Sequence, residues 1–336
     1  MLLESPSNWR DYELIDSGDF EKLERFGNYY LIRPEPKALW GRTLPTKEWM
    51  SMAHTRFTTG AGFGSSGKED SGSWNMLKKM DEQWMISYNR PEYSFKLRLG
   101  LTAFKHVGVF PEQAPNWDYI YAKTREVGNA TPGVKPKILN LFAYTGAASL
   151  AANCGGGNVT HLDSVKQVVN WARVNMELSK LDNIRWVIED ALKFVQREAR
   201  RGNIYQGIIL DPPAYGHGPD GERWKLDELL FELLVEVSKI LAPKDSFVVL
   251  NLYSNGYSAV LADTLIKTSF KLNPSAKSVT NDPAKGATNV PTKGVTNQSG
   301  KTDGFKKERE LTFGELVLRD KFDKALPLSV FTRLKR

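Results

Sequence analysis

The strongest constraint on this chain is the order of features in residues 138–163, which read ILNLFAYTGAASLAANCGGGNVTHLD. An apolar run of strand length, residues 138–143, leads directly into the turn Tyr144-Thr145-Gly146. A helix of small residues follows, three glycines end it, and a second apolar run precedes Asp163. This order predicts one strand–helix–strand unit of a parallel sheet.

The turn and the acid of this unit predict a nucleoside site. In a parallel sheet the turn after the first strand opens onto a helix N-terminus, and an acid about 20 residues further on accepts hydrogen bonds from ribose hydroxyls. The spacing from Gly146 to Asp163 fits. The glycines that a pyrophosphate requires are missing, so a nucleoside without phosphates suits the turn better. The structural alternative is an ordinary Rossmann-like unit, in which Gly146 only makes a turn and Asp163 only caps a helix.

A second motif follows the apolar run of residues 208–210 and reads DPPAYG, from Asp211 to Gly216. A proline cannot extend a strand ladder, so two of them fix the backbone directly after the strand. They hold carbonyl groups and the ring of Tyr215 over the carboxyl edge of the sheet, where open α/β folds bind ligands.

Taken together, FAYTGAAS, THLD, IEDA and LDPPAYG resemble class I S-adenosylmethionine-dependent methyltransferases. The resemblance extends from about residue 93 to the end of the chain, and is strongest to the bacterial group that includes large-subunit ribosomal RNA cytosine methyltransferases. It implies a Rossmann-like α/β sheet, mostly parallel with an antiparallel last strand. It also implies S-adenosylmethionine as cofactor and RNA, ribosomal RNA above all, as substrate.

The residues predicted at the cofactor are Phe110, Gln113, Tyr144, Thr145, Gly146, Asp163, Ser164, Asp190, Ala191 and Asp211. Phe110 and Gln113 are placed there by the resemblance, since their segment closes over the cofactor in the family; a purely structural turn is the alternative. Asp190 matches the family acid that reaches the adenine amino group, and it is also a candidate helix N-cap.

The methyl acceptor requires separate groups. An exocyclic amine needs acceptors for its N–H groups and an aromatic platform, which Asp211, the Pro212 carbonyl and Tyr215 supply. Carbon 5 of a pyrimidine needs a cysteine thiolate instead. The cytosine-modifying relatives carry that cysteine just after the fifth strand, where this chain has Asn251-Leu252-Tyr253-Ser254. We therefore expect transfer to nitrogen or oxygen, or to a substrate other than a pyrimidine carbon.

The chain's single cysteine, Cys154, follows the first helix of the motif, which places it at the opposite edge of the sheet. The four histidines share no metal spacing, so no metal is expected. His217 alone lies on the substrate loop, either as a base or as an ordinary loop residue.

Composition indicates two domains with an insertion. Residues 1–95 carry short β-type runs and predict a small β-rich domain, and residues 96–336 predict the methyltransferase domain. Aromatic and basic residues alternate in the first domain, either as an RNA surface or as aromatic core plus solvated charge. In residues 273–303, PAKGATNV is nearly repeated as PTKGVTNQ, which indicates a low-complexity insertion.

Charge and hydropathy add further expectations. Of the net charge of +7, most lies between residues 271 and 309, where eight Lys or Arg face three Asp or Glu. Such a segment promotes solubility or contacts RNA. The chain has no apolar run of about 18 residues and no signal-peptide pattern. With one cysteine, this favours a cytoplasmic protein without membrane contact; the sequence does not indicate an oligomeric state.

Overall fold

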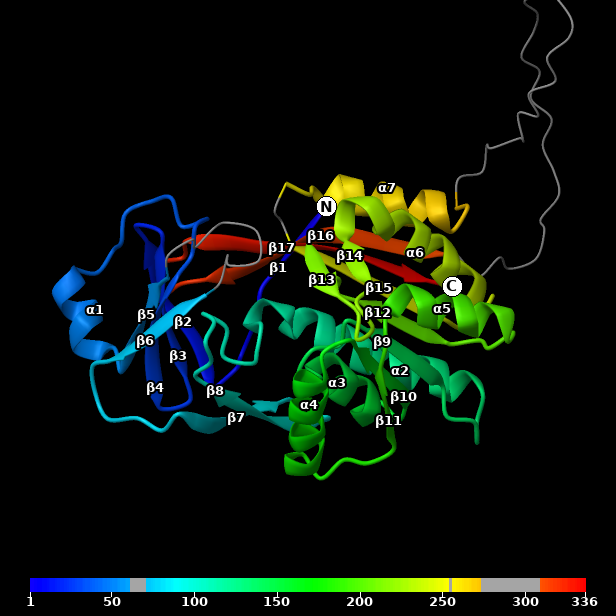
Figure 1. Ribbon diagram of the computed structural model, residues 1–336, viewed down its shortest axis with the longest axis horizontal. Coiled ribbons are helices and arrows are strands. Elements are labelled where there is room, and N and C mark those ends of the chain that lie inside the picture. Colours follow the sequence, from blue (N-terminus) through cyan, green and yellow to red (C-terminus); the bar gives the residue numbers. More distant parts are fainter. Residues whose placement is uncertain (61–70, 254–255, 273–308) are drawn as a thin grey trace, which may run out of the picture.

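The computed structural model describes residues 1–60, 71–253, 256–272 and 309–336, and its centre is an eight-stranded sheet (Figure 1). The strand order is β1-β16-β17-β15-β12-β9-β10-β11. The strands are β1 (Leu2–Glu4), β9 (Lys137–Leu141), β10 (Asn158–Asp163), β11 (Ile184–Ile188), β12 (Gly207–Leu210), β15 (Phe247–Tyr253), β16 (Glu310–Arg319) and β17 (Ala325–Lys335). Strands β9 to β12 and β15 pair in parallel, and β17 is antiparallel to both of its neighbours. The predicted Rossmann-like sheet with an antiparallel last strand is confirmed.

The strand order reverses direction between β9 and β12. From β9 the chain proceeds to β10 and β11 on one side, whereas β12 and β15 lie on the other side. In open parallel sheets, ligands bind in the crevice beside such a reversal, at the carboxyl ends of the strands. The turn after β9 and the DPPAYG loop after β12 both lie at this place.

Helices cover both faces of the sheet. Figure 1 shows α2 (Ala114–Ala130), α3 (Ala147–Cys154) and α4 (Lys166–Leu178) on one face, and α5 (Ala191–Arg200), α6 (Leu226–Ile240) and α7 (Ala259–Ser269) on the other. Successive residues of β12 point to opposite faces: Ile209 packs in the hydrophobic core that includes α2, and Ile208 and Leu210 pack in the core that includes α6. Burial on both faces explains why the parallel strands are almost continuously apolar.

The N-terminal part forms a second β-rich unit. Its five-stranded sheet consists of β2 (Tyr12–Gly18), β3 (Glu21–Phe26), β4 (Tyr29–Pro34), β5 (Thr55–Thr59) and β6 (Gly72–Met76), with α1 (Thr46–Met52) beside it. A hairpin of β7 (Gln83–Asn89) and β8 (Ser94–Gly100) leads on to α2. Phe26 and Trp49 are fully buried, and Arg33 forms an ion pair with Glu24 at 2.7 Å, so these residues belong to the core of this unit.

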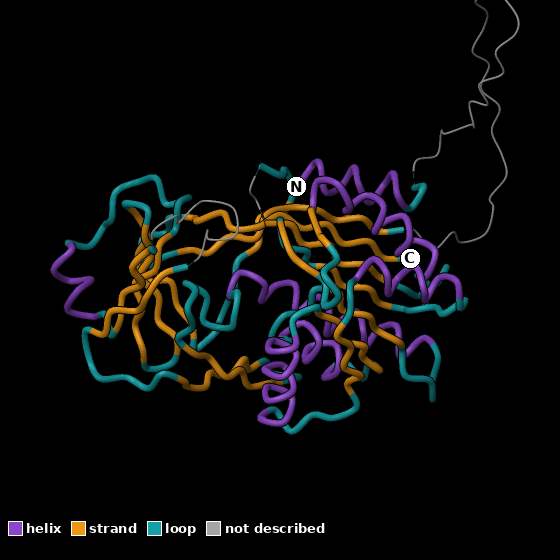
Figure 2. Tube along the Cα trace, in the orientation of Figure 1, coloured by secondary structure: helices purple, strands orange, loops and turns teal. Residues whose placement is uncertain are grey.

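Several contacts join the units, and two involve segments of the larger unit that are far apart in the sequence. The turn between β16 and β17 extends into the N-terminal sheet, as the tube in Figure 2 shows. There Lys324 donates to Asp16 at 2.7 Å, and Ser17 donates to Asp320 at 2.9 Å. At the second contact, the ring of Trp9 lies 5.6 Å from that of Trp117 on α2. The N-terminal unit is therefore held both by the β16–β17 turn and by α2.

Some expectations fall outside this description. The low-complexity insertion at 273–303 and most of the glycine-rich loop between β5 and β6 lie outside the described residues. The domain boundary at residue 95 stays a prediction, and β1, which precedes it, is a strand of the large sheet and pairs with β16. Among the described residues, no helix has the length and apolar character needed to span a bilayer.

Candidate active site

The turn after β9 adopts an unusual backbone. Phe142 and Tyr144 have φ angles of 54° and 49°, and Gly146 has a φ of 91°. Residues that carry a side chain rarely adopt a positive φ. A Cβ on Gly146 would also lie only 3.0 Å from the Cβ of Ala172 on α4. Positive φ angles clustered at one turn are typical of functional sites, where surrounding contacts maintain the strain.

Asp163, the last residue of β10, holds this turn in place. Its Oδ2 accepts a hydrogen bond from the Tyr144 N–H at 2.9 Å, and its Oδ1 accepts one from the Val165 N–H at 2.9 Å. Burial raises the pKa of Asp163, and these N–H donors oppose the shift. Each carboxylate oxygen has a second lone pair, so the side chain retains capacity for ribose hydroxyls.

A cavity begins at this turn and extends along the carboxyl edge to Asp211. About 540 Å³ of it is not filled by atoms, part of this space being open to solvent. Of the predicted residues, those that line it are Phe110, Gln113, Tyr144, Thr145, Gly146 and Asp211. Asp163 is not itself in the lining, but it accepts a hydrogen bond from the N–H of Tyr144, which does line the cavity. The geometry therefore joins both motifs at one cavity.

The segment of residues 108–113, which leads into α2, closes one side of this cavity. The Phe110 ring lies 5.3 Å from the Tyr144 ring and 5.7 Å from the Tyr253 ring at the end of β15. Gln113 is buried and accepts a hydrogen bond from the Asn116 side chain at 2.9 Å. Thr145 donates to the carbonyl of Gly108 at 2.7 Å, which fixes the segment against the turn. The placement of Phe110 and Gln113 agrees with a role in enclosing a ligand.

Besides Asp163, three residues predicted at the cofactor lie outside the cavity lining. Asp190 caps α5, since its Oδ1 accepts the Lys193 N–H at 2.9 Å, and Ala191 is buried in the first turn of that helix. Ser164 follows Asp163 and is partly exposed. A cap carboxylate keeps a second oxygen, so Asp190 retains an acceptor for an adenine amino group, and its role stays a prediction.

Asp211, directly after β12, and Asn251, on the neighbouring strand β15, form a polar pair in the cavity. The Asn251 side-chain amide donates to Asp211 Oδ1 at 2.7 Å. Burial raises the pKa of Asp211 to about 6, and this hydrogen bond opposes the shift. Asn251 is 2% exposed, and its Oδ1 has no partner among the described residues. A buried acceptor left without a donor costs roughly 1–3 kcal/mol, so this atom marks a place where a ligand can donate.

The loop after Asp211 forms a hairpin that the sequence did not reveal. Pro212 is buried, and β13 (Tyr215–His217) pairs with β14 (Arg223–Lys225). The Trp224 indole donates to the Pro213 carbonyl at 2.7 Å, which holds the loop rigidly. Tyr215 is 49% exposed, and its ring therefore remains available to an acceptor.

Glu112 is a further acid that the sequence interpretation missed. It is 2% exposed, next to Gln113, and its Oε1 lies 3.5 Å from the Tyr253 hydroxyl. Burial raises its pKa to about 7; Lys22 opposes the shift, while the charges of Glu24 and Asp211 add to it. Only its place inside a Pro-Glu-Gln turn was visible in the sequence, which carries no sign of burial.

Cys154 and His161 do not line this cavity. Cys154 is at the C-terminal end of α3, and burial raises its pKa to about 11, which leaves little thiolate at neutral pH. His161 bonds to Ser149 at 3.0 Å, and burial lowers its pKa to about 3, so it is a neutral core residue. Among the described residues, no three His, Cys, Asp or Glu side chains gather to hold a metal.

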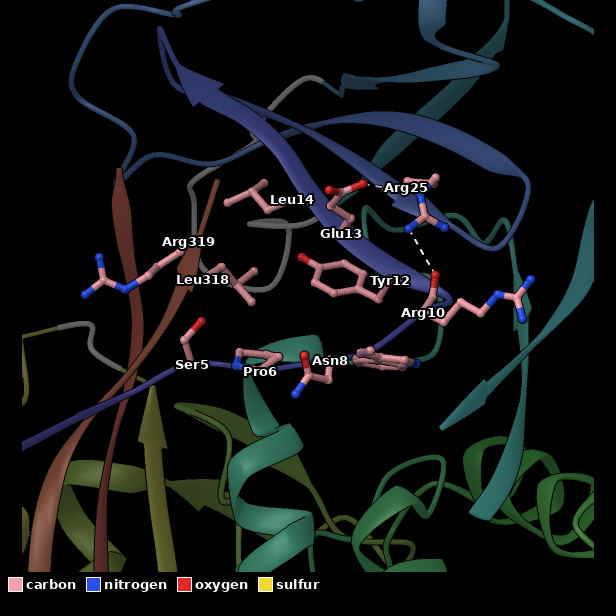
Figure 3. A pocket seen from close by; sticks show the side chains of 11 residues that line it. Ser5, Pro6, Asn8, Arg10, Tyr12, Glu13, Leu14, Arg25, Leu318 and Arg319 are labelled. Atoms are coloured by element: carbon pink, nitrogen blue, oxygen red, sulfur yellow. Dashed lines mark hydrogen bonds and ion pairs between the residues drawn. The ribbon is translucent and has the colours of Figure 1, made fainter. Parts of the chain in front are cut away.

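A larger hollow lies between residues 5–10, β2, β3 and the end of β16 (Figure 3). None of the predicted residues lines it. Its charged groups are partly held by one another, since Arg25 forms an ion pair with Glu13 at 3.5 Å and donates to the Arg10 carbonyl at 3.0 Å. The motifs therefore identify the smaller cavity, at the carboxyl edge, as the site.

The groups that line the cavity at the carboxyl edge fit a positively charged nucleoside. Asp211 and several aromatic rings line this cavity, and none of the described Lys or Arg residues does. Asn251 Oδ1 is an acceptor that no described residue supplies with a donor. Carboxylates and aromatic faces attract cations. A pyrophosphate would meet neither cationic side chains nor a glycine-rich turn. Such a set suits the sulfonium and amino groups of S-adenosylmethionine.

Comparisons with known proteins agree with this assignment. No family model matches the chain. It is 32% identical to a SAM-dependent methyltransferase from Agrobacterium tumefaciens of known crystal structure, with a TM-score of 0.79, covering 100% of this chain and 93% of that one. A putative SAM-dependent methyltransferase from Streptococcus mutans shares the fold, at 15% identity and a TM-score of 0.63, covering 98% of this chain and 76% of that one.

Curated relatives match a shorter stretch. The ribosomal RNA large subunit methyltransferase K/L of Shewanella frigidimarina is 30% identical over 182 residues, which are 53% of this chain and 24% of that protein. The chain thus spans about a quarter of the length of such relatives. The full-length likeness to the Agrobacterium enzyme, together with the cavity that joins the two motifs, leads to one assignment. The chain belongs to the SAM-dependent methyltransferases, and S-adenosylmethionine is its cofactor.

Proposed function

We propose that this enzyme methylates a nitrogen or oxygen atom of RNA, with large-subunit ribosomal RNA as the favoured substrate and no covalent cysteine intermediate. The observation that carries the proposal is the position of Asp211. Its carboxylate lines the cofactor cavity, and the rigid loop that follows it presents Tyr215 to solvent. The two parts required by an acceptor base, a proton acceptor and a ring platform, are thus four residues apart on one loop.

The residues predicted at the cofactor would hold it in distinct ways. Asp163 would accept hydrogen bonds from the ribose hydroxyls, Asp190 would accept one from the adenine amino group, and Phe110 and Gln113 would close over the bound molecule. When bound, S-adenosylmethionine supplies a methyl group that its sulfonium charge already activates. The protein must therefore chiefly position the acceptor and take up a proton.

Asp211 is the proton acceptor in this proposal. Its Oδ1 is held by Asn251, and its Oδ2 receives no hydrogen bond from the described residues. The pKa of about 6 leaves the carboxylate mostly ionised at neutral pH, so Oδ2 can accept the proton that an acceptor N–H or O–H releases. The Pro212 carbonyl orients a second N–H of an exocyclic amine, and Tyr215 stacks on the base.

Two observations support an RNA acceptor and the absence of covalent catalysis. The curated relatives over half of the chain are named ribosomal RNA large subunit methyltransferases. The stretch Asn251-Leu252-Tyr253-Ser254 stands where related enzymes carry the cysteine that attacks pyrimidines, and Cys154, the chain's single cysteine, is distant at the end of α3. Ribosomal RNA as substrate also implies action in the cytoplasm.

The test is transfer of a labelled methyl group to defined acceptors. We expect the purified enzyme to label ribosomal RNA rather than protein, and nucleoside mass spectrometry to find the label on nitrogen or oxygen. Asp211→Ala should lower kcat by roughly 10²-fold to 10⁴-fold, the range typical of a lost general base. Labelling of protein alone, or label on pyrimidine carbon 5, would overturn the proposal.

A further inference from the structure

The hairpin after the DPPAYG loop has two different faces. Its register pairs Tyr215 with Lys225, Gly216 with Trp224, and His217 with Arg223. Because side chains alternate along a strand, cross-strand partners share a face. Tyr215, Lys225, His217 and Arg223 therefore lie together on one face, which we call the hairpin face, and Trp224 lies on the other.

Trp224 attaches the hairpin to the enzyme. It is 3% exposed, its ring lies 4.8 Å from that of Phe142 in the turn after β9, and its indole donates to the Pro213 carbonyl. The buried side of the hairpin thus contacts both motifs of the active site. The hairpin face has a fixed position directly after Asp211 and Pro212.

The hairpin face carries positive charge that the protein itself does not neutralise. Arg223 and His217 are exposed, and neither side chain has a hydrogen bond or ion pair with the described residues. Two neighbouring carboxylates have other partners, since Glu222 pairs with Lys193 and Glu228 pairs with Lys225 at 2.5 Å. Arg223 is therefore free to bind an anion from solution.

We propose that the hairpin face binds the single-stranded RNA segment beside the nucleotide that is methylated, with Arg223 contacting a phosphate and Tyr215 stacking on a base. This inference rests on the proposed function and adds to it the surface that holds the substrate. A cation and an aromatic ring on one two-stranded ribbon match the backbone and bases of a single strand. A guanidinium binds phosphate through two parallel N–H groups. The face is also continuous with the acceptor loop, as a flanking nucleotide requires.

An acidic protein segment is the competing partner for such a face. It would use the same charge but would gain nothing from an exposed aromatic ring aligned with the catalytic loop. Phosphate contacts also give a characteristic fall of affinity with salt, with a slope of roughly 0.7 per phosphate for single strands. These two properties separate the partners by experiment.

The experiment measures binding of fluorescently labelled single-stranded oligouridine to the full chain by anisotropy over a range of salt concentrations. We expect Arg223→Ala to weaken binding roughly 5-fold to 20-fold and to reduce the salt slope by roughly 0.7. Arg223→Lys should recover part of the affinity, since it keeps the charge but not the paired donors. With ribosomal RNA as substrate, Arg223→Ala should raise KM far more than it lowers kcat.

Arg200→Ala is the matched control. Arg200 is an exposed arginine without a hydrogen bond or ion pair to the described residues, at the C-terminal end of α5. Arg200→Ala removes the same charge as Arg223→Ala, but from the end of α5 rather than from the hairpin face. Calorimetric binding of S-adenosylmethionine and the melting temperature should be equal in the wild type, Arg223→Ala and Arg200→Ala, which excludes misfolding as the cause.

The outcomes separate this inference from the proposed function. If the wild type binds and methylates RNA while Arg223→Ala matches Arg200→Ala in affinity, salt slope and KM, the hairpin face is not the RNA site and the proposed function stands. If the wild type binds S-adenosylmethionine but neither binds nor methylates any RNA, the proposed function fails. If polyglutamate displaces oligouridine as well as unlabelled RNA does, the surface recognises acidic protein and this inference is overturned.

Discussion

The turn after β9 and the loop after β12 border the same cavity, but they differ in how far their polar groups are satisfied. In the turn, each carboxylate oxygen of Asp163 already accepts a backbone N–H, and Thr145 bonds to Gly108. At the loop, Asp211 Oδ2 and the neighbouring Asn251 Oδ1 on β15 receive no hydrogen bond from the described residues. The cofactor side is therefore preorganised, and the acceptor side keeps unused hydrogen-bonding capacity for a substrate.

The comparison predicts that a change on the satisfied side affects binding most. Asp163→Ala removes the acceptor of the Tyr144 N–H as well as the ribose contact. We expect calorimetry to show S-adenosylmethionine affinity lowered roughly 100-fold, since a hydrogen bond to a charged group contributes roughly 1.5–3 kcal/mol. Asp163→Asn, which keeps one acceptor oxygen, should lie between. Equal affinity in all three proteins would show that the turn does not depend on this acid.

A change on the unsatisfied side should affect catalysis and its pH dependence instead. Without the Asn251 amide that opposes the shift, the pKa of Asp211 rises further above 6. Asn251→Ala should therefore lower kcat roughly fivefold at pH 6, which is the loss of ionised carboxylate that a rise of about one pKa unit causes there, and hardly at all at pH 8. The measurement is the pH profile of single-turnover methyl transfer.

A matched control for this variant is Asn203→Ala. Asn203 also donates to a carboxylate, that of Glu198 at 2.8 Å, but neither residue lines the cavity. Its pH profile should equal that of the wild type. An unchanged profile for Asn251→Ala would contradict the pairing of Asn251 with Asp211.

Glu112 tests the electrostatic cost of the acceptor side. Its folded pKa of about 7 lies above the ordinary value of 4.5, so its protonated form favours the fold. The stability that protonation contributes is complete below pH 4.5 and is lost as the pH rises through 7. Glu112→Gln should therefore raise the free energy of unfolding by about 1–3 kcal/mol at pH 8, with little change at pH 4.5.

Urea unfolding at both pH values checks this sign, and Glu126 provides the opposite case. At Glu126, burial raises the pKa, but Lys123 and Lys335 outweigh it and the net shift is downward. Glu126→Gln should reduce stability at pH 8 and not at pH 3. Destabilisation of Glu112→Gln at pH 8 would show that Glu112 is needed as a charged partner of Lys22.

The smallest effect is expected at Cys154, which lies on neither side of the cavity. Cys154→Ala should leave kcat and KM for RNA within about twofold of the wild type, since a thiol with a pKa of about 11 provides little nucleophile at neutral pH. Thiol alkylation of the wild type should likewise leave activity intact. Loss of methyl transfer in Cys154→Ala would reopen the covalent route.

Much of the large sheet could be predicted from local patterns. The apolar runs before Tyr144 and Asp211 are strands because both faces of a parallel sheet are buried. The segment of residues 226–241 is amphipathic because only one face of α6 is buried against the sheet. The hairpin β13–β14 escaped prediction because each strand has only three residues, two of them polar or glycine. Its pairing depends on Trp224 being buried against Phe142, a contact between distant parts of the sequence.

The sequence by itself determined the family, the sheet and the two motifs, because these follow from local periodicity and from turns that few residues can make. Only the tertiary structure decided which polar groups are satisfied. Glu112 and Asn251 look ordinary in the sequence, and burial between distant segments gives one a pKa of about 7 and leaves the other with an acceptor lacking a donor. The pairing of β1 with β16 is equally non-local. Burial and pairing depend on chain segments hundreds of residues apart, which no local pattern encodes.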